Sequence, residues 1–391
     1  MPHRFRAPSP AVHRASTVLF ESVAHLDEIH AAYRCGDCSM KMYGTFGTPT
    51  TDELEHLVLE AEGGHGAVFA PSGLGAVALG LMSVARAGGH LLIPDNVYGP
   101  TRDLCDTTLA RLGAETEYYD PRLDAAIVNH IKPNTIAVLI ESPGSYTFEV
   151  QDVPAMVRVI RSAGPNATII ADNAWGSPGL FRPLDHGVDI SVVPLTKYWG
   201  GHADILLGAV VARQASWTAL RDTATALGYC TNGDEAYLAI RGARSVEIRL
   251  REHERSGLAI ARWLESHPRV SRVLHPALPG SPGHEIWLRD FRGSNGLFAF
   301  RLRGTAGASA NATEVGEFVD RLLATGAFGL GYSWGGFESL VMPAMLPGGP
   351  NIKRTVSTER FDDLVRLHIG LEPVDRLTAA LTTALGDPAT P

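Results

Sequence analysis

Short apolar segments alternate with helix-like segments through the first half of the chain. Six of them are rich in β-branched residues and apolar on both faces, which is typical of strands buried in a parallel sheet. They are Ala67–Ala70, His90–Pro94, Thr135–Ile140, Ala167–Ala171, Asp189–Val193 and Ile205–Ala212. Helical periodicity lies between them, at Gly75–Ala87, Arg102–Gly113 and Val153–Ala163. This alternation predicts a doubly wound, mostly parallel α/β domain, in which ligands bind at the carboxyl ends of the strands.

The remaining pattern predicts an arm before this domain and a smaller α+β domain after it. Residues 1–48 carry scattered Pro, Gly, Cys and His with little periodicity. Thr50-Thr51-Asp52-Glu53 reads as a capping box that opens a helix ending at Gly63-Gly64. We therefore expect an N-terminal arm at 1–48, an α/β domain at 49–243 and a C-terminal α+β domain at 244–391.

The C-terminal domain is predicted from a mixture of helical and strand-like segments. The expected helices are Arg244–His267, Ala312–Ala324 and Val374–Leu385, and the expected strands are Val270–Val273, Gly296–Leu302 and Val365–Ile369.

Composition and charge exclude several classes of function. The chain has 391 residues, of which 45% are hydrophobic and 19% charged, so a disordered chain is excluded. A net charge of −8 without a basic cluster argues against a nucleic-acid partner. No apolar run is long enough to span a membrane, and the N-terminus lacks the apolar core of a signal peptide, so we expect a cytoplasmic protein without a membrane partner.

The four cysteines do not form a recognisable metal site or disulfide scaffold. Cys35 and Cys38 make a C-x-x-C with His30 nearby, but the second pair that a structural zinc site needs is missing. We expect no metal and a reducing compartment.

A glycine-rich turn resembles a dinucleotide-binding motif. Gly73-Leu-Gly-Ala-Val-Ala78 fits G-x-G-x-x-A between a predicted strand and a helix, and Asp95 ends the next strand, where a ribose-binding acid belongs. Taken alone, this favours a nicotinamide enzyme. The pattern is short, however, and its physical content is a helix N-terminus that can hold some phosphate group.

A lysine at a strand end suggests covalent chemistry. The chain has only four lysines among 34 basic residues, and Lys197 follows the buried strand Asp189–Val193. A lysine there is suited to forming a Schiff base, a reaction for which arginine cannot substitute. Asp172 ends the preceding strand. A phosphate cradle, a carboxylate and a lysine at neighbouring strand ends are what pyridoxal phosphate requires.

Longer blocks resemble one family nearly from end to end. The chain is similar to the cysteine/methionine-metabolism family of fold-type-I pyridoxal-phosphate enzymes and, within it, to the bacterial cystathionine β-lyases. The blocks that carry the resemblance are Tyr43-Gly-Thr-Phe-Gly-Thr-Pro-Thr50, Glu141-Ser-Pro-Gly-Ser145, Asp172-Asn-Ala-Trp175, Thr196-Lys197-Tyr198, Tyr332-Ser-Trp-Gly-Gly-Phe-Glu-Ser339 and Arg366-Leu-His-Ile-Gly-Leu-Glu372.

The resemblance implies a role for each matching residue. Lys197 is expected to hold the cofactor and to act in catalysis, Asp172 to pair with the ring nitrogen, and Tyr98 to stack on the ring and take part in catalysis. The phosphate is expected to contact the backbone of Gly73 and Leu74, the hydroxyl of Thr196, and Tyr43 of a neighbouring subunit. The substrate is expected to contact Arg366, which clamps its α-carboxylate, together with Ser333, Trp334 and Tyr43. Shared active sites imply a homodimer or homotetramer.

Two positions depart from the family pattern. Most relatives carry an arginine two residues after the arm tyrosine, where this chain has Thr45, and many carry a serine at the position of Pro194. The first change removes a charged phosphate partner and the second a hydroxyl. We therefore expect the cofactor to be held more loosely than in relatives that keep the arginine.

The resemblance implies a β-elimination reaction, as used in trans-sulfuration and methionine biosynthesis. Cystathionine, or a related cysteine thioether, would yield a thiol such as homocysteine, pyruvate and ammonia. Trp334 and the absence of an asparagine from Glu141–Ser145 favour β over γ chemistry. The alternatives are a γ-lyase or substituted-cysteine lyase of the same family and, more distantly, a nicotinamide oxidoreductase or a repurposed scaffold with weak activity.

Overall fold

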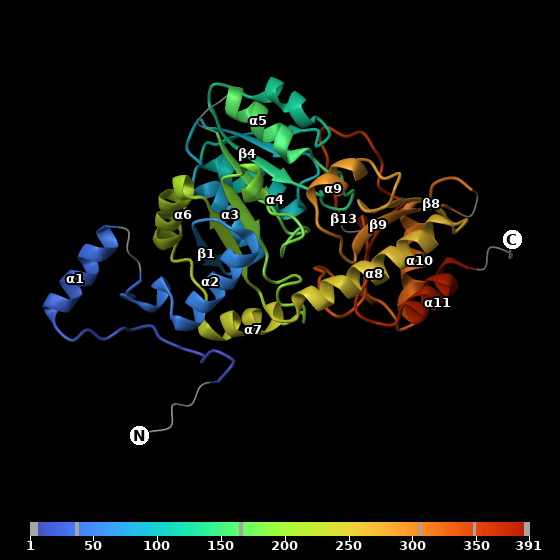
Figure 1. Cartoon of the computed structure of the whole chain (residues 1–391). Coiled ribbons are helices and arrows are strands. Elements are labelled where there is room, and N and C mark those ends of the chain that lie inside the picture. The colour runs from blue at the N-terminus through green and yellow to red at the C-terminus, as the bar shows by residue number, and fades with distance from the viewer. Residues whose placement is uncertain (1–6, 36–38, 164–166, 305–306, 347–348, 387–391) are drawn as a thin grey trace.

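The computed structural model of the chain contains two large sheets in separate lobes. It describes residues 7–35, 39–163, 167–304, 307–346 and 349–386. Figure 1 shows the seven-stranded sheet in the N-terminal lobe and the five-stranded sheet in the C-terminal lobe, with the long helix α8 (Val246–Glu265) leading from one to the other. The predicted combination of a larger α/β unit with a smaller α+β unit is confirmed.

The seven-stranded sheet is mostly parallel, as expected, but one of its strands runs the other way. The strand order is β1-β7-β6-β5-β4-β2-β3, and β7 is antiparallel to both of its neighbours. The strands are β1 (Gly66–Ala70), β2 (His90–Pro94), β3 (Glu115–Tyr119), β4 (Thr135–Glu141), β5 (Thr168–Asp172), β6 (Ile190–Val193) and β7 (Gly208–Ala212). The six predicted strands are all present. β3 was missed because this edge strand is largely polar and only partly buried.

The loop between β6 and β7 begins and ends at the same edge of this sheet. Val193 pairs with Ala209 in the antiparallel ladder, and the Thr196 N–H donates to the Leu207 carbonyl at 3.0 Å. The chain therefore leaves β6, passes through the lysine segment and returns without crossing the sheet. The expected strand Ile205–Ala212 starts later, at Gly208, because residues 205–207 belong to this loop.

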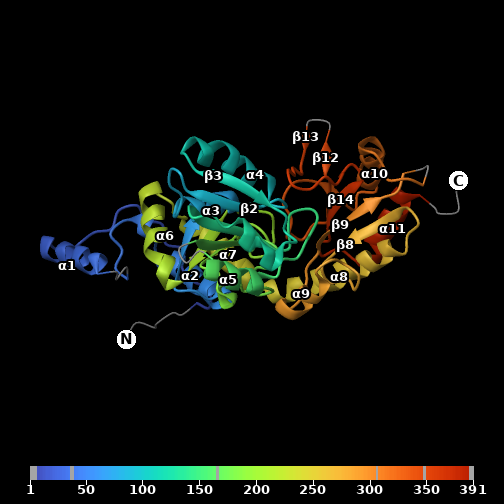
Figure 2. The same ribbon diagram turned by 90° about the horizontal axis from the view of Figure 1, so that it is seen from above.

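Helices cover both faces of the seven-stranded sheet, as Figure 2 shows from above. One apolar cluster joins the sheet to α2, α5 and α7, and a second joins it to α3 and α6. These helices are α2 (Pro49–Glu62), α3 (Gly73–Met82), α4 (Gly99–Asp103), α5 (Val153–Ala163), α6 (Gln214–Leu227) and α7 (Gly233–Ala243). The predicted helix Arg102–Gly113 is instead α4 followed by a π-helical turn at Leu104–Leu109.

The expected capping box is displaced by two residues. Thr48, rather than Thr50, is the N-cap of α2, and its side chain accepts from the Thr51 N–H while the Thr51 hydroxyl caps in return. Pro49 occupies the first helical position, where its missing N–H costs nothing. That proline was the signal that placed the true start.

The five-stranded sheet has the order β10-β11-β14-β9-β8 and packs against α8, α10 and α11 through one apolar cluster. Its strands are β8 (Val270–Leu274), β9 (Leu297–Leu302), β10 (Gly329–Leu330), β11 (Leu340–Pro343) and β14 (Leu364–His368). A small hairpin pairs β12 (Met345–Leu346) with β13 (Gly349–Pro350), and the helices are α9 (His284–Asp290), α10 (Ala312–Ala324) and α11 (Val374–Leu385). All predicted strands and helices of this half are present within a few residues.

The N-terminal arm contains a helix that the pattern did not predict. α1 (Val23–Arg34) is capped by Ser22, and Ile29 is its only buried residue among those described. Figures 1 and 2 both show α1 standing apart from the rest of the molecule. The sequence pattern did not predict α1 because its apolar periodicity is weak. A helix that buries almost nothing within its own chain needs no apolar stripe facing the core.

Candidate active site

Two of the expected residues lie at the carboxyl ends of neighbouring strands. Asp172 is the last residue of β5, and Lys197 lies in the loop that follows the end of β6 at Val193. The two strands are parallel neighbours, with Asp172 opposite Val192. The sheet therefore brings the carboxylate and the amine to one edge, as a doubly wound fold does for its ligands.

Asp172 is a buried carboxylate with one oxygen left open. It is 6% exposed, and its Oδ1 accepts from the Ala174 N–H at 3.1 Å. Burial raises the pKa of Asp172 to about 6, against the opposing effects of the Ala174 N–H and Lys197. A buried carboxylate of this kind is stabilised by a cation placed at its open oxygen, which a protonated pyridine nitrogen supplies.

Lys197 has an amine that loses its proton near neutral pH. Its Nζ donates to the Ser333 hydroxyl at 2.7 Å and lies 4.8 Å from the centroid of the Trp334 ring. Burial, and after it the Arg366 guanidinium, lowers the pKa of Lys197 to about 7, with Asp172 acting in the opposite direction. The uncharged amine is the form that attacks an aldehyde and accepts a proton from carbon.

The turn before α3 forms a cradle for a phosphate. Gly73 and Leu74 open α3 after the N-cap Ser72, which accepts only from the Gly75 N–H, so the two preceding N–H groups have no acceptor within the helix. A Cβ on Gly73 would lie 2.9 Å from the Pro194 Cβ, so the side chain that replaces the usual serine packs directly against the cradle.

Thr196 is less available to a phosphate than the family pattern suggests. Its hydroxyl accepts from the Leu207 N–H at 3.0 Å and donates to the Leu207 carbonyl at 3.2 Å. To donate to a phosphate, the hydroxyl must turn its proton away from that carbonyl. Together, the open carboxylate oxygen, the neutral amine and the helix N-terminus fit pyridoxal phosphate, with a weaker contribution from Thr196.

Tyr98 is held beside this edge through its backbone. The residue is the N-cap of α4, its side chain is 45% exposed, and its N–H donates to Glu141 Oε2 at 2.8 Å. Glu141 ends β4 and pairs in register with Asp172. Burial, together with the nearby Asp172, raises the pKa of Glu141 well above its ordinary value. Glu141 was not among the expected site residues, although it occupies the same strand-end position as Asp172, a signal that could have identified it.

Arg366 is a buried cation without an acidic partner. It lies in β14, is 9% exposed, and forms no ion pair with any carboxylate of the described residues. Its Nη2 donates to the Ser333 carbonyl at 3.2 Å, and its Cζ lies 5.0 Å from the centroid of the Tyr146 ring. A buried guanidinium of this kind is complementary to a carboxylate supplied by a ligand. Ser333 contacts both Arg366 and Lys197, so it connects the two sheets at the site.

Tyr43 is the expected site residue that this chain does not bring to the others. It is 48% exposed and pairs through an isolated bridge with Thr17, inside the arm. Thr45 is exposed in the same turn. Any contact of Tyr43 with a cofactor has to be made in another subunit.

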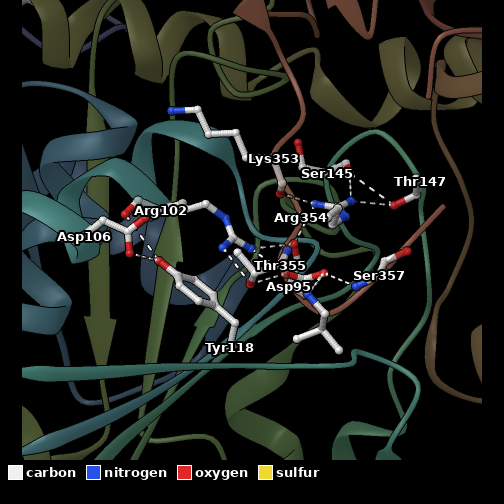
Figure 3. A network of polar contacts seen from close by, with 11 residues as sticks. Asp95, Arg102, Asp106, Tyr118, Ser145, Thr147, Lys353, Arg354, Thr355 and Ser357 are labelled. Carbon is white, nitrogen blue, oxygen red and sulfur yellow. Dashed lines mark hydrogen bonds and ion pairs between the residues drawn. The ribbon is translucent and has the colours of Figure 1, made fainter. Parts of the chain in front are cut away.

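Asp95 is not available to a ribose. Its carboxylate is 1% exposed and accepts from Arg102 and from three N–H groups, those of Thr355, Val356 and Ser357, as Figure 3 shows. Moreover, β1 and β2 are separated by four strands in the sheet, whereas the dinucleotide motif requires adjacent parallel strands. The nicotinamide alternative is therefore wrong on both counts.

Metal and membrane sites are not found in the described part of the chain. No group of three or more His, Cys, Asp or Glu there could hold a metal ion, and no helix there is long and apolar enough to cross a membrane. Cys38 lies outside the described residues, so its C-x-x-C with Cys35 stays untested.

Comparisons with known proteins cover almost the whole chain. The family model described as Cys/Met metabolism PLP-dependent enzyme matches residues 2–386. A putative cystathionine beta-lyase of Rhizobium johnstonii is 46% identical over 378 residues, which are 96% of this chain and 90% of the relative. Cystathionine beta-lyase MetC of Escherichia coli is 41% identical over 375 residues, covering 96% of this chain and 92% of the relative.

A solved structure has a similar fold over almost the whole chain. The crystal structure of cystathionine gamma synthase from Xanthomonas oryzae pv. oryzae, in complex with aminoacrylate and cysteine, matches with a TM-score of 0.85. The two sequences are 29% identical, and the match covers 97% of this chain and 93% of that one.

Proposed function

This chain belongs to the Cys/Met metabolism family of PLP-dependent enzymes, and from that premise we propose that it cleaves cystathionine, or a related cysteine thioether, by β-elimination. Pyridoxal phosphate is its cofactor, and the enzyme is a carbon–sulfur lyase. The observation that carries the proposal is that Ser333 contacts both the Lys197 amine and the buried Arg366 guanidinium. The pKa of Lys197 is about 7, and Arg366 has no ion-pair partner among the described residues.

The residues of the seven-stranded sheet are proposed to hold the cofactor. Lys197 would bind it covalently, Asp172 would keep a proton on its ring nitrogen, and the N–H groups of Gly73 and Leu74 would hold its phosphate, with Thr196 assisting. Tyr98, which is 45% exposed, would stack on it. When bound, pyridoxal phosphate supplies the electron sink that accepts the electron pair left by the Cα proton.

The residues of the five-stranded sheet are proposed to hold the substrate. Arg366 binds the α-carboxylate, and Ser333 fixes both the guanidinium and the Lys197 amine in position. With cofactor and substrate bound, the Lys197 amine would remove the Cα proton. The Cβ–S bond then breaks, and the Lys197 ammonium returns the proton to the leaving thiolate. The remaining three-carbon fragment hydrolyses to pyruvate and ammonia.

Two features favour β- over γ-elimination. The segment Glu141–Ser145 lacks the asparagine usual in γ-acting relatives, and Trp334 places an indole 4.8 Å from the Lys197 amine. A γ-lyase or a substituted-cysteine lyase is the second candidate, and its product would differ.

The arm supports an assembly of two or four copies with shared active sites. Leu19 and Val23 are 89% and 76% exposed on a segment that stands away from its own lobe, and Tyr43 contacts none of the other site residues in its own chain. A neighbouring subunit that covers these residues and receives Tyr43 accounts for both facts. We further propose that the chain consists of an arm at 1–48 and two domains at 49–243 and 244–391. We also propose that the protein is cytoplasmic.

One experiment separates the candidates. Purified protein should be yellow, and borohydride, which reduces a Schiff base, should abolish the visible band and leave the cofactor covalently attached to the native protein but not to Lys197→Ala. With cystathionine, the native enzyme should release pyruvate. Release of 2-oxobutyrate instead would assign γ-cleavage, and a coloured protein that cleaves neither bond would refute the proposed substrate.

A further inference from the structure

Arg354 reaches from the C-terminal lobe to two loops of the seven-stranded sheet. It follows the β12–β13 hairpin, and its guanidinium donates to three uncharged oxygens of those loops, which Figure 3 shows, besides the carbonyl of the adjacent Lys353 at 3.5 Å. Nη1 donates to the Asp95 carbonyl at 2.7 Å, and Nη2 donates to the Ser145 carbonyl at 3.1 Å and the Thr147 hydroxyl at 2.8 Å. No carboxylate of the described residues forms an ion pair with it. The planar fork of arginine can join two loops in this way, whereas the single ammonium of lysine cannot.

The two residues that Nη2 contacts flank a tyrosine in a strained backbone conformation. Tyr146 has a φ of 64°, in the left-handed region that bulky side chains rarely adopt. Phe148 has a φ of 56° in the same loop. Such a conformation persists only where surrounding contacts enforce it, and it is concentrated at functional sites. Arg354 supplies such contacts on both sides of Tyr146.

The strained conformation aims the Tyr146 ring at the proposed carboxylate anchor. The ring is 6% exposed, and its centroid lies 5.0 Å from the Arg366 Cζ. A relaxed backbone at Tyr146 would move the ring and leave one face of the guanidinium uncovered. The Ser333 carbonyl, which accepts from Arg366 at 3.2 Å, and the Tyr146 ring are two contacts that together fix the plane of the guanidinium.

We propose that Arg354 is a positioning residue that holds Tyr146 against Arg366 and thereby preorganises the anchor for the substrate α-carboxylate. This inference rests on the proposed function only in taking Arg366 as that anchor. The segment that carries Arg354 is itself fixed, because the Asp95 carboxylate accepts from Thr355, Val356 and Ser357. Arg354 therefore affects binding of the α-carboxylate by Arg366 without contacting the substrate itself.

Glycine is the probe for this proposal, because it carries the α-amine and α-carboxylate but no leaving group. Its binding to the cofactor-loaded enzyme is followed by the change in visible absorbance, and thermal unfolding is measured in parallel. Arg354→Met should weaken glycine binding on the order of tenfold, which is the usual scale of a lost positioning contact. The matched control is Lys353→Met, which breaks an exposed ion pair to Asp103 in the same segment and should leave glycine binding unchanged.

A double-mutant cycle with Tyr146→Leu distinguishes positioning from general destabilisation. If Arg354 acts through Tyr146, then Arg354→Met should have little further effect on glycine affinity once the ring is gone. Thr147→Val, which removes one acceptor of Arg354, provides a milder variant should Arg354→Met fail to fold.

Two outcomes would overturn the proposal: unchanged glycine affinity in both Arg354→Met and Thr147→Val, or strictly additive effects with Tyr146→Leu. Glycine binding is independent of which thioether the enzyme cleaves. If cystathionine is not cleaved but the effects of Arg354→Met and Tyr146→Leu on glycine affinity are non-additive, the proposed substrate is rejected and the role of Arg354 is retained.

Discussion

Uptake of pyridoxal phosphate by the apoprotein should depend on pH through Lys197. Only the uncharged amine attacks the aldehyde, and burial, followed by the Arg366 guanidinium, lowers the pKa of Lys197 to about 7. The rate of uptake should therefore rise with pH and level off above a midpoint near that value.

The size of the effect follows from the fraction of uncharged amine. With a pKa of about 7, this fraction falls roughly tenfold between about pH 8 and pH 6, and the uptake rate should fall with it. A lysine with an ordinary pKa of about 10.4 would be uncharged in well under about one molecule in a hundred at pH 8. The buried position should therefore accelerate uptake on the order of a hundredfold at that pH.

The assay is the rate at which the visible band appears when cofactor is mixed with apoprotein in stopped flow, across a pH series. Two variants move the midpoint in opposite directions. Arg366→Gln removes a positive charge that lowers the pKa of Lys197, so the midpoint should rise. Asp172→Asn removes a negative charge that raises this pKa, so the midpoint should fall. Each shift should be roughly half a unit to one unit.

Opposite shifts in these two variants are the decisive result, because the cofactor's own titrating groups are the same in every sample. A midpoint above about pH 9 in the native protein would refute the assignment of a depressed pKa to Lys197. Midpoints that move together in the two variants would show that charges near the amine do not control uptake.

Three further predictions follow from particular residues. Thr45→Arg should restore a phosphate partner and tighten cofactor binding by roughly tenfold to a hundredfold in an equilibrium titration, and equal affinities would refute the expectation of loose retention. Glu62 is fully buried, and burial raises its pKa to about 7, so its favourable contribution to stability is lost as pH rises from about 4.5 through 7. Glu62→Gln should therefore raise the thermal midpoint relative to the native protein at about pH 8 but not at about pH 5. Asp95→Asn should lower the free energy of unfolding in urea by about 3 kcal/mol, since it leaves buried donors without their charged acceptor; a change below about 1 kcal/mol would contradict the importance of that carboxylate.

The strand ends of the larger sheet could be predicted from sequence, because a continuous apolar run has a visible end. β2 and α5 have the predicted bounds, and Asp172 and Lys197 follow such runs. Helix boundaries were less certain where two signals competed, as at Thr48 and Thr50. The direction of β7 could not be read from its apolar pattern, because a buried antiparallel strand and a buried parallel strand look alike.

The substrate side of the site depends on contacts that no local pattern encodes. Lys197 and Ser333 are 136 positions apart, and Arg354 and Thr147 are 207 apart. Family resemblance supplied Ser333 and Arg366, but neither pattern nor resemblance indicated Tyr146 or Arg354. The left-handed backbone at Tyr146 is especially hard to foresee, since nothing in its side chain favours that conformation.

The antiparallel direction of β7 places the segment that carries Lys197 between two strands that pair with each other. A parallel β7 would need a crossover of a dozen or more residues over one face of the sheet, and any change in the loop would then disturb the helices there. Because the chain instead returns along β6, residues 194–207 form an excursion anchored at both ends by the Val193–Ala209 pair. Substitutions within residues 194–207 therefore act on the groups that this segment contacts, Gly73 and Ser333 among them, and not through a crossover helix.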